Sequence, residues 1–430
     1  MKAVKRYFDM QKCLITGFLL AYALSSVSVA GPREQAKRIH DRLTGVPASN
    51  QMLDEMEDEI RFGGGRTAAA LLAIDGGPGV TATGGFYTVT LKNWATPWTN
   101  EGADPFAALN DYSATIVGMV RDGDDFRDIL SGNVIYTGNV PGIPAYANDG
   151  NAHYEYLEAS GANLGDPAVL VRNSQAAVTG FPIDAVAGVM TTRASARAFF
   201  VDGTNRAMFR FTVLNHLCMD MEQLKDSSRP TDRIRQDVSR SPGGDSTLFL
   251  NQCVSCHSGM DPMAQAFAYY NFDYPSEDER PGMELEARKD LGAMVYTAGQ
   301  VQGKYLINSA TFSPGYVTPN NHWTNYWRLG ENSGRVGWNE PAANSGSVDL
   351  ALNPAYSEGD GAASLGRELA NSEAFAQCQV RKVFRSVCLR EPQDTPGERL
   401  AMDGLLSTYN ASYNIKQVFA GVADYCASHL

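Results

Sequence analysis

Apolar residues recur at helical spacing along most of the chain. Together with capping and stop residues, this spacing predicts helices over four stretches of the first third: 33–43, 50–61, 105–120 and 124–130. A short alternating stretch over 86–91 predicts a strand, and Trp94 and Trp98 are expected in the loop that follows. The glycine-rich patches at 63–65 and 76–79 lack the neighbours of a phosphate-binding loop, so flexible loops are expected there.

The middle of the chain alternates between helical and irregular patterns. Residues 140–153 carry turn-forming residues and predict a surface loop, whereas 191–218 predict a helical stretch. The charged, proline- and glycine-rich segment 223–244 is predicted to be a linker. A short helix is expected over 245–252, and Asp261, which precedes a proline, is expected to cap the start of a second helix.

The helical pattern is stronger in the last part of the chain than in the stretch before it. Residues 281–354 show weak periodicity and predict long loops. Ser372 is the expected N-cap of a helix that ends before Pro392, because prolines disfavour helix continuation. Two further helices near 397–408 and 413–427 would complete an antiparallel three-helix unit.

The most informative motif is Cys-Val-Ser-Cys-His at 253–257. Two thiols separated by two residues can each add across a vinyl group of haem, and the histidine that follows then ligates the iron from the proximal side. This spacing predicts one covalently attached haem c, with Cys253 and Cys256 as attachment residues and His257 as iron ligand.

Two other readings of the motif are weaker. A zinc site needs a second ligand pair roughly 12 to 20 residues away, and the nearest pair, His216 and Cys218, lies outside that range. A thioredoxin-like dithiol would be expected in a βαβ setting, which the surrounding pattern lacks. Haem attachment therefore remains the favoured interpretation.

Several basic residues and histidines are candidates for further haem contacts. Arg193 and Arg197 are four residues apart, as are Arg206 and Arg210, so each pair shares a helix face and could bind haem propionates. Of these, Arg206 and Arg210 are the candidates, with ordinary surface salt bridges as the alternative. His153 is expected to be a solvated loop residue, and His216 a core or capping residue and not an iron ligand.

The ligand opposite His257 decides what the iron can do. Methionine favours a high-potential carrier, histidine a lower potential, and a vacant position permits oxygen or peroxide chemistry. Met283, which follows a proline-glycine pair, is the candidate distal ligand, with Met294 and His322 behind it. Packing in the core is the alternative for any single methionine.

The N-terminus resembles an export signal. Residues 1–30 combine a basic start, an apolar core too short to span a bilayer and a small-residue cleavage site at Ser28-Val29-Ala30, which predicts a periplasmic or secreted protein. Cleavage would remove four positive side chains and one negative, taking the formal charge from −12 to −15. Such a surface disfavours nucleic acid and anionic membranes, and basic redox proteins are the expected partners. No other stretch is apolar enough to cross a membrane.

Four of the seven cysteines remain after Cys13 and the two haem thiols are set aside, an even number that suits an oxidising compartment. If Cys378 and Cys388 share one helix, about 15 Å separate them, beyond the roughly 7 Å limit for a disulfide. In an up-down-up arrangement Cys426 would lie near Cys388. The predicted pairs are therefore Cys388 with Cys426 and Cys218 with Cys378, the alternative being four buried free thiols.

The haem motif continues as Ser-Gly-Met-Asp-Pro through Pro262, with Phe267 and Asn271-Phe272-Asp273 further on. This segment resembles the haem module of a family of secreted monohaem cytochromes typical of planctomycetes and marine proteobacteria. Phe126 to Leu130 and Cys378 to Arg390 are similar to its companion modules, and Arg206 and Leu217-Cys218 to the segment before its haem. The resemblance implies haem c and a periplasmic redox setting, and no particular substrate.

The sequence thus predicts a mainly α protein, a cytochrome c-like haem module flanked by helical modules with few short strands. Its expected parts are a signal peptide (1–30), an N-terminal helical region (31–222), a haem module with long loops (245–355) and a C-terminal three-helix module (360–430). The expected function is single-electron transfer between periplasmic redox partners. The alternatives are a monohaem enzyme acting on peroxide or oxygen through an open distal site, and a non-catalytic scaffold with structural haem.

Overall fold

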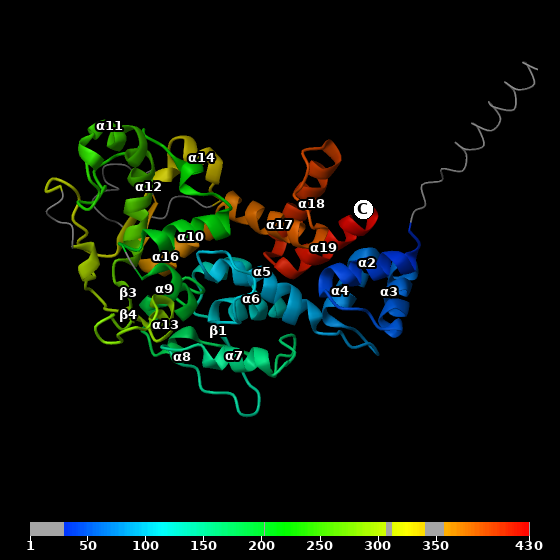
Figure 1. Cartoon of the computed structure of the whole chain (residues 1–430). Helices are drawn as coiled ribbons and strands as arrows, with labels where there is room; N and C mark the ends of the chain where they lie inside the picture. Colours follow the sequence, from blue (N-terminus) through cyan, green and yellow to red (C-terminus); the bar gives the residue numbers. More distant parts are fainter. Residues whose placement is uncertain (1–29, 202, 307–311, 340–356, 430) are drawn as a thin grey trace, which may run out of the picture.

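The computed structural model describes residues 30–201, 203–306, 312–339 and 357–429. The expected signal peptide, apart from Ala30, and parts of the expected long loops therefore lie outside the described residues. Within the described ranges the chain is mainly helical with few short strands, as the sequence predicts (Figure 1). The strands form three two-stranded antiparallel sheets.

The α-helices in chain order are α2 (Pro32–Thr44), α3 (Asn50–Phe62), α4 (Gly65–Asp75), α5 (Lys92–Ala95), α6 (Asp111–Asp122), α7 (Ala152–Ala159), α8 (Gln175–Thr179), α9 (Arg193–Phe199), α10 (Arg206–Leu217), α11 (Ser246–Leu248), α12 (Val254–Ala264), α13 (Leu285–Asp290), α14 (Glu331–Val336), α16 (Gly361–Ala370), α17 (Glu373–Cys388), α18 (Pro396–Ser412) and α19 (Ile415–His429). The sheets pair β1 (Ile135–Gly138) with β2 (Leu170–Asn173), β3 (Tyr270–Asp273) with β4 (Ala293–Tyr296), and β5 (His322–Asn325) with β6 (Ser357–Asp360).

The two ends of the described chain lie together. Helices α2, α3 and α4 pack on one another, and α19 packs against α2 and α4 at the same end of the molecule (Figure 1). The Arg66 side chain of α4 donates to the Asp424 carboxylate of α19 at 2.5 Å, and Lys416 of α19 lies 2.9 Å from Asp75. Helix α19 also packs against α17 and α18, so it joins the first helices of the chain to the last ones.

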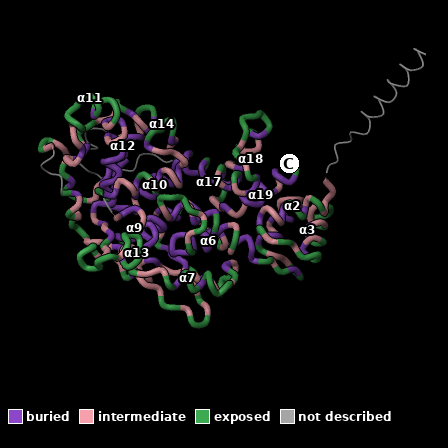
Figure 2. Tube along the Cα trace, in the orientation of Figure 1, coloured by how far each residue is buried: buried purple, intermediate pink, exposed green. Residues whose placement is uncertain are grey.

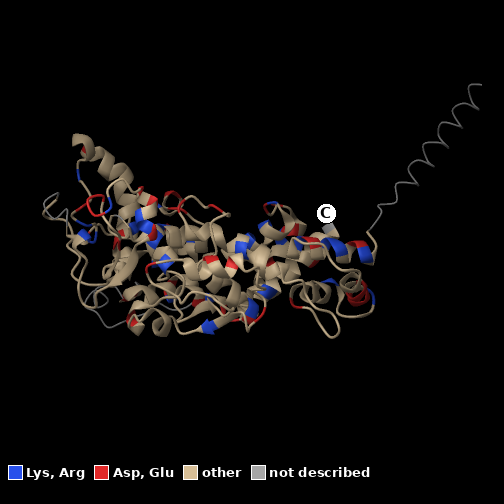
Figure 3. Ribbon diagram, turned by 60° about the horizontal axis from the view of Figure 1, so that its bottom comes forward, with Lys and Arg blue, Asp and Glu red and all other residues tan. Residues whose placement is uncertain are grey.

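One large apolar core runs from these terminal helices to the region of α12. Its members come from nearly every helix, and the buried trace runs through α6, α10 and α17 in the middle of the molecule (Figure 2). Apolar residues on one side of α17, such as Val380, Val383 and Val387, are buried, and the Ser372 side chain accepts the N–H of Phe375 as the predicted N-cap. Charged residues of both signs are interspersed along the length of the molecule (Figure 3).

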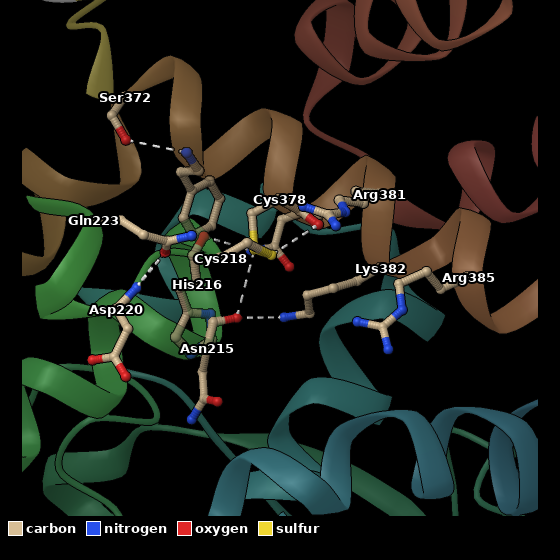
Figure 4. The surroundings of a disulfide bond; sticks show 12 residues. Asn215, His216, Cys218, Asp220, Gln223, Ser372, Cys378, Arg381, Lys382 and Arg385 are labelled. Atoms are coloured by element: carbon tan, nitrogen blue, oxygen red, sulfur yellow. Dashed lines mark hydrogen bonds between the residues drawn. A yellow bond between two sulfur atoms is a disulfide. The ribbon is translucent and has the colours of Figure 1, made fainter. Parts of the chain in front are cut away.

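Both predicted disulfides are present. Cys218 at the end of α10 bonds to Cys378 of α17 with their Cα atoms 5.3 Å apart, and Cys388 bonds to Cys426 with a Cα separation of 5.6 Å. Beside the first disulfide, the Lys382 ammonium donates to the Asn215 carbonyl at 2.6 Å (Figure 4). The two bonds therefore tie α17 to α10 at one end and to α19 at the other.

Several local predictions for the N-terminal half are wrong. Residues 86–91, expected as a strand, form a π-helical turn, η1 (Phe86–Leu91), that continues into α5 and a 3-10 helix, η2 (Thr96–Thr99), where a loop was expected for Trp94 and Trp98. The strand prediction is wrong because Phe86, Tyr87 and Leu91 are all buried. Burial at these positions follows a helical spacing and not the two-sided alternation of a strand. Gly65 begins α4 and does not lie in a flexible loop.

The expected helix over 105–120 begins later, at Asp111, where Asn110 and Ser113 form a capping box. The helix expected over 124–130 is a 3-10 helix, η3 (Phe126–Leu130), and 191–218 is divided into α9 and α10. His153, expected in solvent, is buried at the start of α7, where it accepts the Gly138 N–H at 2.8 Å and donates to the Pro144 carbonyl at 2.7 Å. Two backbone partners across a turn satisfy both ring nitrogens, which the sequence pattern does not reveal.

Candidate haem-attachment site

The haem motif lies on one continuous helical stretch. The Asp245 side chain caps α11 by accepting the Thr247 N–H at 2.8 Å, and a π-helical turn, η7 (Phe249–Cys253), leads directly into α12. Cys253 ends that turn, and Cys256 and His257 lie on the first turn of α12. The predicted short helix over 245–252 is thus extended through the motif, which holds the two thiols and the imidazole on a rigid element.

The two motif cysteines are free thiols, and the other four described cysteines are in disulfides. Cys253 packs beside a small apolar cluster that includes Ile234, Phe249 and Val254, and it is partly exposed. Cys256 is also partly exposed, and its thiol lies 3.7 Å from the Met221 carbonyl oxygen. Burial raises the pKa of the Cys256 thiol. Both sulfurs remain available for thioether formation.

His257 is oriented by a buried carboxylate. Its Nδ1–H donates to Oδ1 of Asp261, one helical turn further along α12, at 3.0 Å. The Asp261 side chain is fully buried, whereas that of His257 is 20 % exposed. With Nδ1 engaged, the tautomer leaves Nε2 as the ring nitrogen with a free lone pair. Metal-ligating histidines commonly show this arrangement, in which the second ring nitrogen donates to a carboxylate or a carbonyl.

Two other groups hold Asp261 through three hydrogen bonds. The Arg206 guanidinium donates to its two oxygens at 2.7 and 3.1 Å, and the backbone N–H of Arg235 donates to Oδ2 at 3.2 Å. Although burial alone would raise it, the charges of Arg206 and Arg235 and the His257 hydrogen bond hold the pKa of Asp261 well below its usual range. With His257 as the fourth donor, the lone pairs of the carboxylate are fully used.

Arg206 is bonded to a second carboxylate as well. Its Nη1 and Nη2 donate to Asp237 at 2.6 and 2.8 Å, so one guanidinium bridges Asp237 and Asp261. A haem propionate at Arg206, the role predicted from sequence, would have to displace one of these carboxylates. Arg210 is paired with Asp220 at 2.6 and 2.8 Å on the surface. Arg193 and Arg197 bind α13 through Asp290 and Glu286.

The segment 223–244, predicted to be a linker, supplies part of this site. Arg235 is buried and donates to the Thr204 carbonyl, while Ile234 and Val238 pack beside Cys253. Asp261 itself was expected to cap a new helix, but α12 runs from Val254 through it, with Pro262 in the last turn. The signal that could have identified Asp261 is its spacing of four residues from His257, which places the two side chains on one helix face.

A cavity of 490 Å³ lies beside the helical turn that ends at Cys253, although Cys253, Cys256 and His257 themselves do not line it. It is lined by Phe249 and Leu250 of the turn that ends at Cys253, by Phe312 and Tyr316, and by Arg240. The Arg240 guanidinium lies over the rings of Phe249 and Phe312, 4.7 and 4.4 Å from their centroids, and donates only to backbone carbonyls in the described ranges. The carboxylate of Asp232 also lines the cavity. Its aromatic side chains and the Arg240 guanidinium nevertheless suit a flat hydrophobic group that carries carboxylates.

The candidate distal ligands occupy different surroundings. Met283 precedes α13, which lies with β3 and β4 at the opposite end of this region from α11 (Figure 1). Met294 is buried in β4 opposite Phe272. His322 of β5 lies 2.9 Å from Asp360 through Nδ1 and 3.4 Å from Glu358 through Nε2.

His216, expected in the core, is buried with Nε2 2.7 Å from the Tyr112 hydroxyl, and burial holds its pKa well below the usual range.

Among the described residues, no group of three or more histidine, cysteine or acidic side chains is arranged to hold a metal ion by itself. The zinc alternative therefore gains no second ligand pair from this part of the chain. Over the same ranges, no helix combines the length and apolarity needed to cross a bilayer.

The architecture is that of a mainly helical, twice disulfide-bonded protein in which the motif cysteines, the partly exposed His257 and the buried Asp261 lie on one continuous helical stretch. Comparison with protein-family models, curated proteins and solved structures finds no match.

Proposed function

We propose that the chain is an exported monohaem c-type cytochrome that carries single electrons between redox proteins. Cys253 and Cys256 would hold the porphyrin through thioethers, and His257 would ligate the iron through Nε2. Haem c bound in this way supplies exchange of one electron between ferrous and ferric iron. The observation that carries the proposal is the combination of two free thiols with an imidazole whose Nδ1–H is held by Asp261.

The residues around the motif fit this group. The aromatic and apolar side chains beside Cys253 provide a surface for the ring, and Arg240 is the candidate partner for a propionate. Partial exposure of Cys253 and His257 would keep one haem edge accessible to a partner protein. The resemblance to secreted cytochromes points to the same class and to a periplasmic setting.

A second candidate function is a monohaem enzyme with an open distal position. The favouring observation is that two of the three candidate distal ligands are engaged elsewhere: Met294 is buried in β4, and His322 is bound by carboxylates. A vacant position permits binding of oxygen or peroxide.

The test is expression in a periplasm with cytochrome-maturation machinery, followed by intact-mass analysis. We expect the mature chain to gain the mass of one haem, and the double variant Cys253→Ser/Cys256→Ser to gain none. Ser255→Ala, inside the same motif, is the matched control and should retain haem, because both motif thiols and His257 stay in place and its hydroxyl donates to the Gln252 carbonyl. A wild-type chain without added haem would overturn the proposal.

The optical and magnetic circular dichroism spectra of the haem-bearing protein then separate the two functions. A near-infrared band from methionine-sulfur ligation supports the electron carrier. A high-spin ferric spectrum supports the enzyme.

A further inference from the structure

We infer that Asp261 acts through His257 to set the reduction potential of the site, holding it lower than a free imidazole ligand would. This inference rests on the proposed haem attachment. Asp261 would be a positioning residue, since it touches the iron ligand and not the iron.

The hydrogen bond acts on the basicity of the ligand. A carboxylate that accepts the Nδ1–H of a ligating histidine withdraws positive charge from the ring and makes Nε2 a stronger donor. A stronger donor stabilises the ferric state more than the ferrous state, and hydrogen bonding to the ligand is one of the means by which a protein tunes haem iron. At 3.0 Å and within one helix, the His257–Asp261 contact has the geometry for this effect.

Burial makes the effect permanent. Water does not compete for the Asp261 carboxylate, because its side chain has no exposed surface. Arg206 and the Arg235 N–H occupy the remaining lone pairs, so the carboxylate cannot rotate away from His257 without losing three other hydrogen bonds. The distance between Asp261 and the ring is therefore set by the fold.

The carboxylate that orients His257 belongs to an ionic cluster with balanced charges. Two carboxylates, Asp237 and Asp261, face two guanidinium groups, Arg206 and Arg235, so the formal charges of the cluster cancel. A buried ionic cluster is weak evidence for stability alone, because apolar residues of similar volume are often as stabilising. A cluster that ends on the iron-ligating histidine is better explained by control of that ligand.

The experiment compares Asp261→Asn with Asp237→Asn in haem-bearing protein. Each variant removes one carboxylate partner of Arg206, but only Asp261 contacts His257. We expect Asp261→Asn to raise the midpoint potential so that the ferric-to-ferrous ratio at fixed potential falls at least tenfold, a shift of about 59 mV for one electron. We expect Asp237→Asn to move it by much less.

Equal potentials in wild type and Asp261→Asn, or equal shifts in the two variants, would overturn the inference. If Asp261→Asn does not yield folded protein, the matched pair Asp261→Glu and Asp237→Glu takes its place, and only the first should change the potential. Haem attachment to the wild type is measured beforehand by intact mass. A wild type without haem contradicts the proposed function, whereas a haem-bearing wild type with an insensitive potential contradicts this inference alone.

Discussion

At the scale of single residues, two arginines four positions apart on α10 have opposite roles. Arg206 is 22 % exposed and bridges Asp237 and Asp261, whereas Arg210 is 46 % exposed and pairs with Asp220 alone. The sequence presents them as equivalent members of one helix face. Their difference arises because Arg206 faces the segment 223–244 and α12, which only the fold brings to it.

This difference predicts unequal losses of stability. Arg206→Gln leaves two carboxylates without their shared partner, and breaking a buried pair costs about 3–5 kcal/mol. Arg210→Gln breaks an exposed pair, for which a loss of about 0–1 kcal/mol is expected. Chemical denaturation of wild type and both variants at neutral pH gives their free energies of unfolding, from which the two losses are compared. Similar free energies for the two variants would contradict the assignment.

The ion pair of Arg206 with Asp237 predicts that the stability of the protein depends on pH. Burial would raise the pKa of Asp237, but the hydrogen bonds and charge of Arg206 outweigh it and the pKa is lowered. A carboxylate with a lowered folded pKa contributes stability that is complete above its unfolded pKa of about 4 and is lost as the pH falls toward the folded pKa. We therefore expect the difference in unfolding free energy between wild type and Arg206→Gln to be largest near neutral pH and to narrow as the pH falls below about 4. A gap that widens in acid would contradict this.

At the scale of elements, α12 depends on a glycine inside the haem motif. A Cβ atom on Gly259 would lie 2.0 Å from Nε1 of Trp327, and both residues are buried. The 3-10 helix η10 (Tyr326–Arg328) that carries Trp327 packs directly on α12. The glycine therefore permits close approach of α12 to the β5–η10 segment.

Gly259→Ala should destabilise the protein by about 1–3 kcal/mol, because an overpacked buried contact forces neighbours out of place. The matched control is Gly404→Ala in α18, where an added Cβ meets no atom within 4 Å. Alanine there should stabilise by up to about 1 kcal/mol through helix propensity. Thermal unfolding of both variants tests the pair, and a neutral Gly259→Ala would indicate that α12 and Trp327 are not in close contact.

At the scale of the whole molecule, the first helices and the last one form a common unit. Helix α19 packs on α2 and α4, and ion pairs of Arg66 with Asp424 and of Lys416 with Asp75 accompany the apolar contact. Phe419 of α19 also lies edge-on to Phe86, with ring centroids 5.0 Å apart. The expected C-terminal module is thus in contact with residues more than three hundred positions earlier in the sequence.

Removal of residues 31–75 should therefore unfold α19 locally. The deletion exposes the apolar face of α19 that α2 and α4 cover, and we expect hydrogen exchange over 415–429 to accelerate strongly. Amides of α10 are the internal reference, because Cys218–Cys378 ties α10 to α17 at a distance from the deletion. Unchanged protection of α19 would show that it needs only α17 and α18.

Sequence alone determined the features that depend on residue type and short spacing. The helical class, the last three helices and the Ser372 cap follow from periodicity and capping chemistry. Helix geometry excludes a bond between Cys378 and Cys388, and the up-down-up order of the last three helices places Cys426 near Cys388, so the two observed pairs were predictable. The prediction of haem attachment rests on the five residues at 253–257 alone and needs no knowledge of the fold.

Only the tertiary structure decided what surrounds that motif. From the sequence, Asp261 is predicted to be a helix cap and 223–244 a linker. Both predictions use local propensity, which contains no information on which charged residues far apart in the sequence come into contact. The buried assembly of Arg206, Arg235, Asp237 and Asp261 requires three segments to converge. A carboxylate is stable away from water only where such partners are supplied, and those contacts between distant residues form only when the whole core folds.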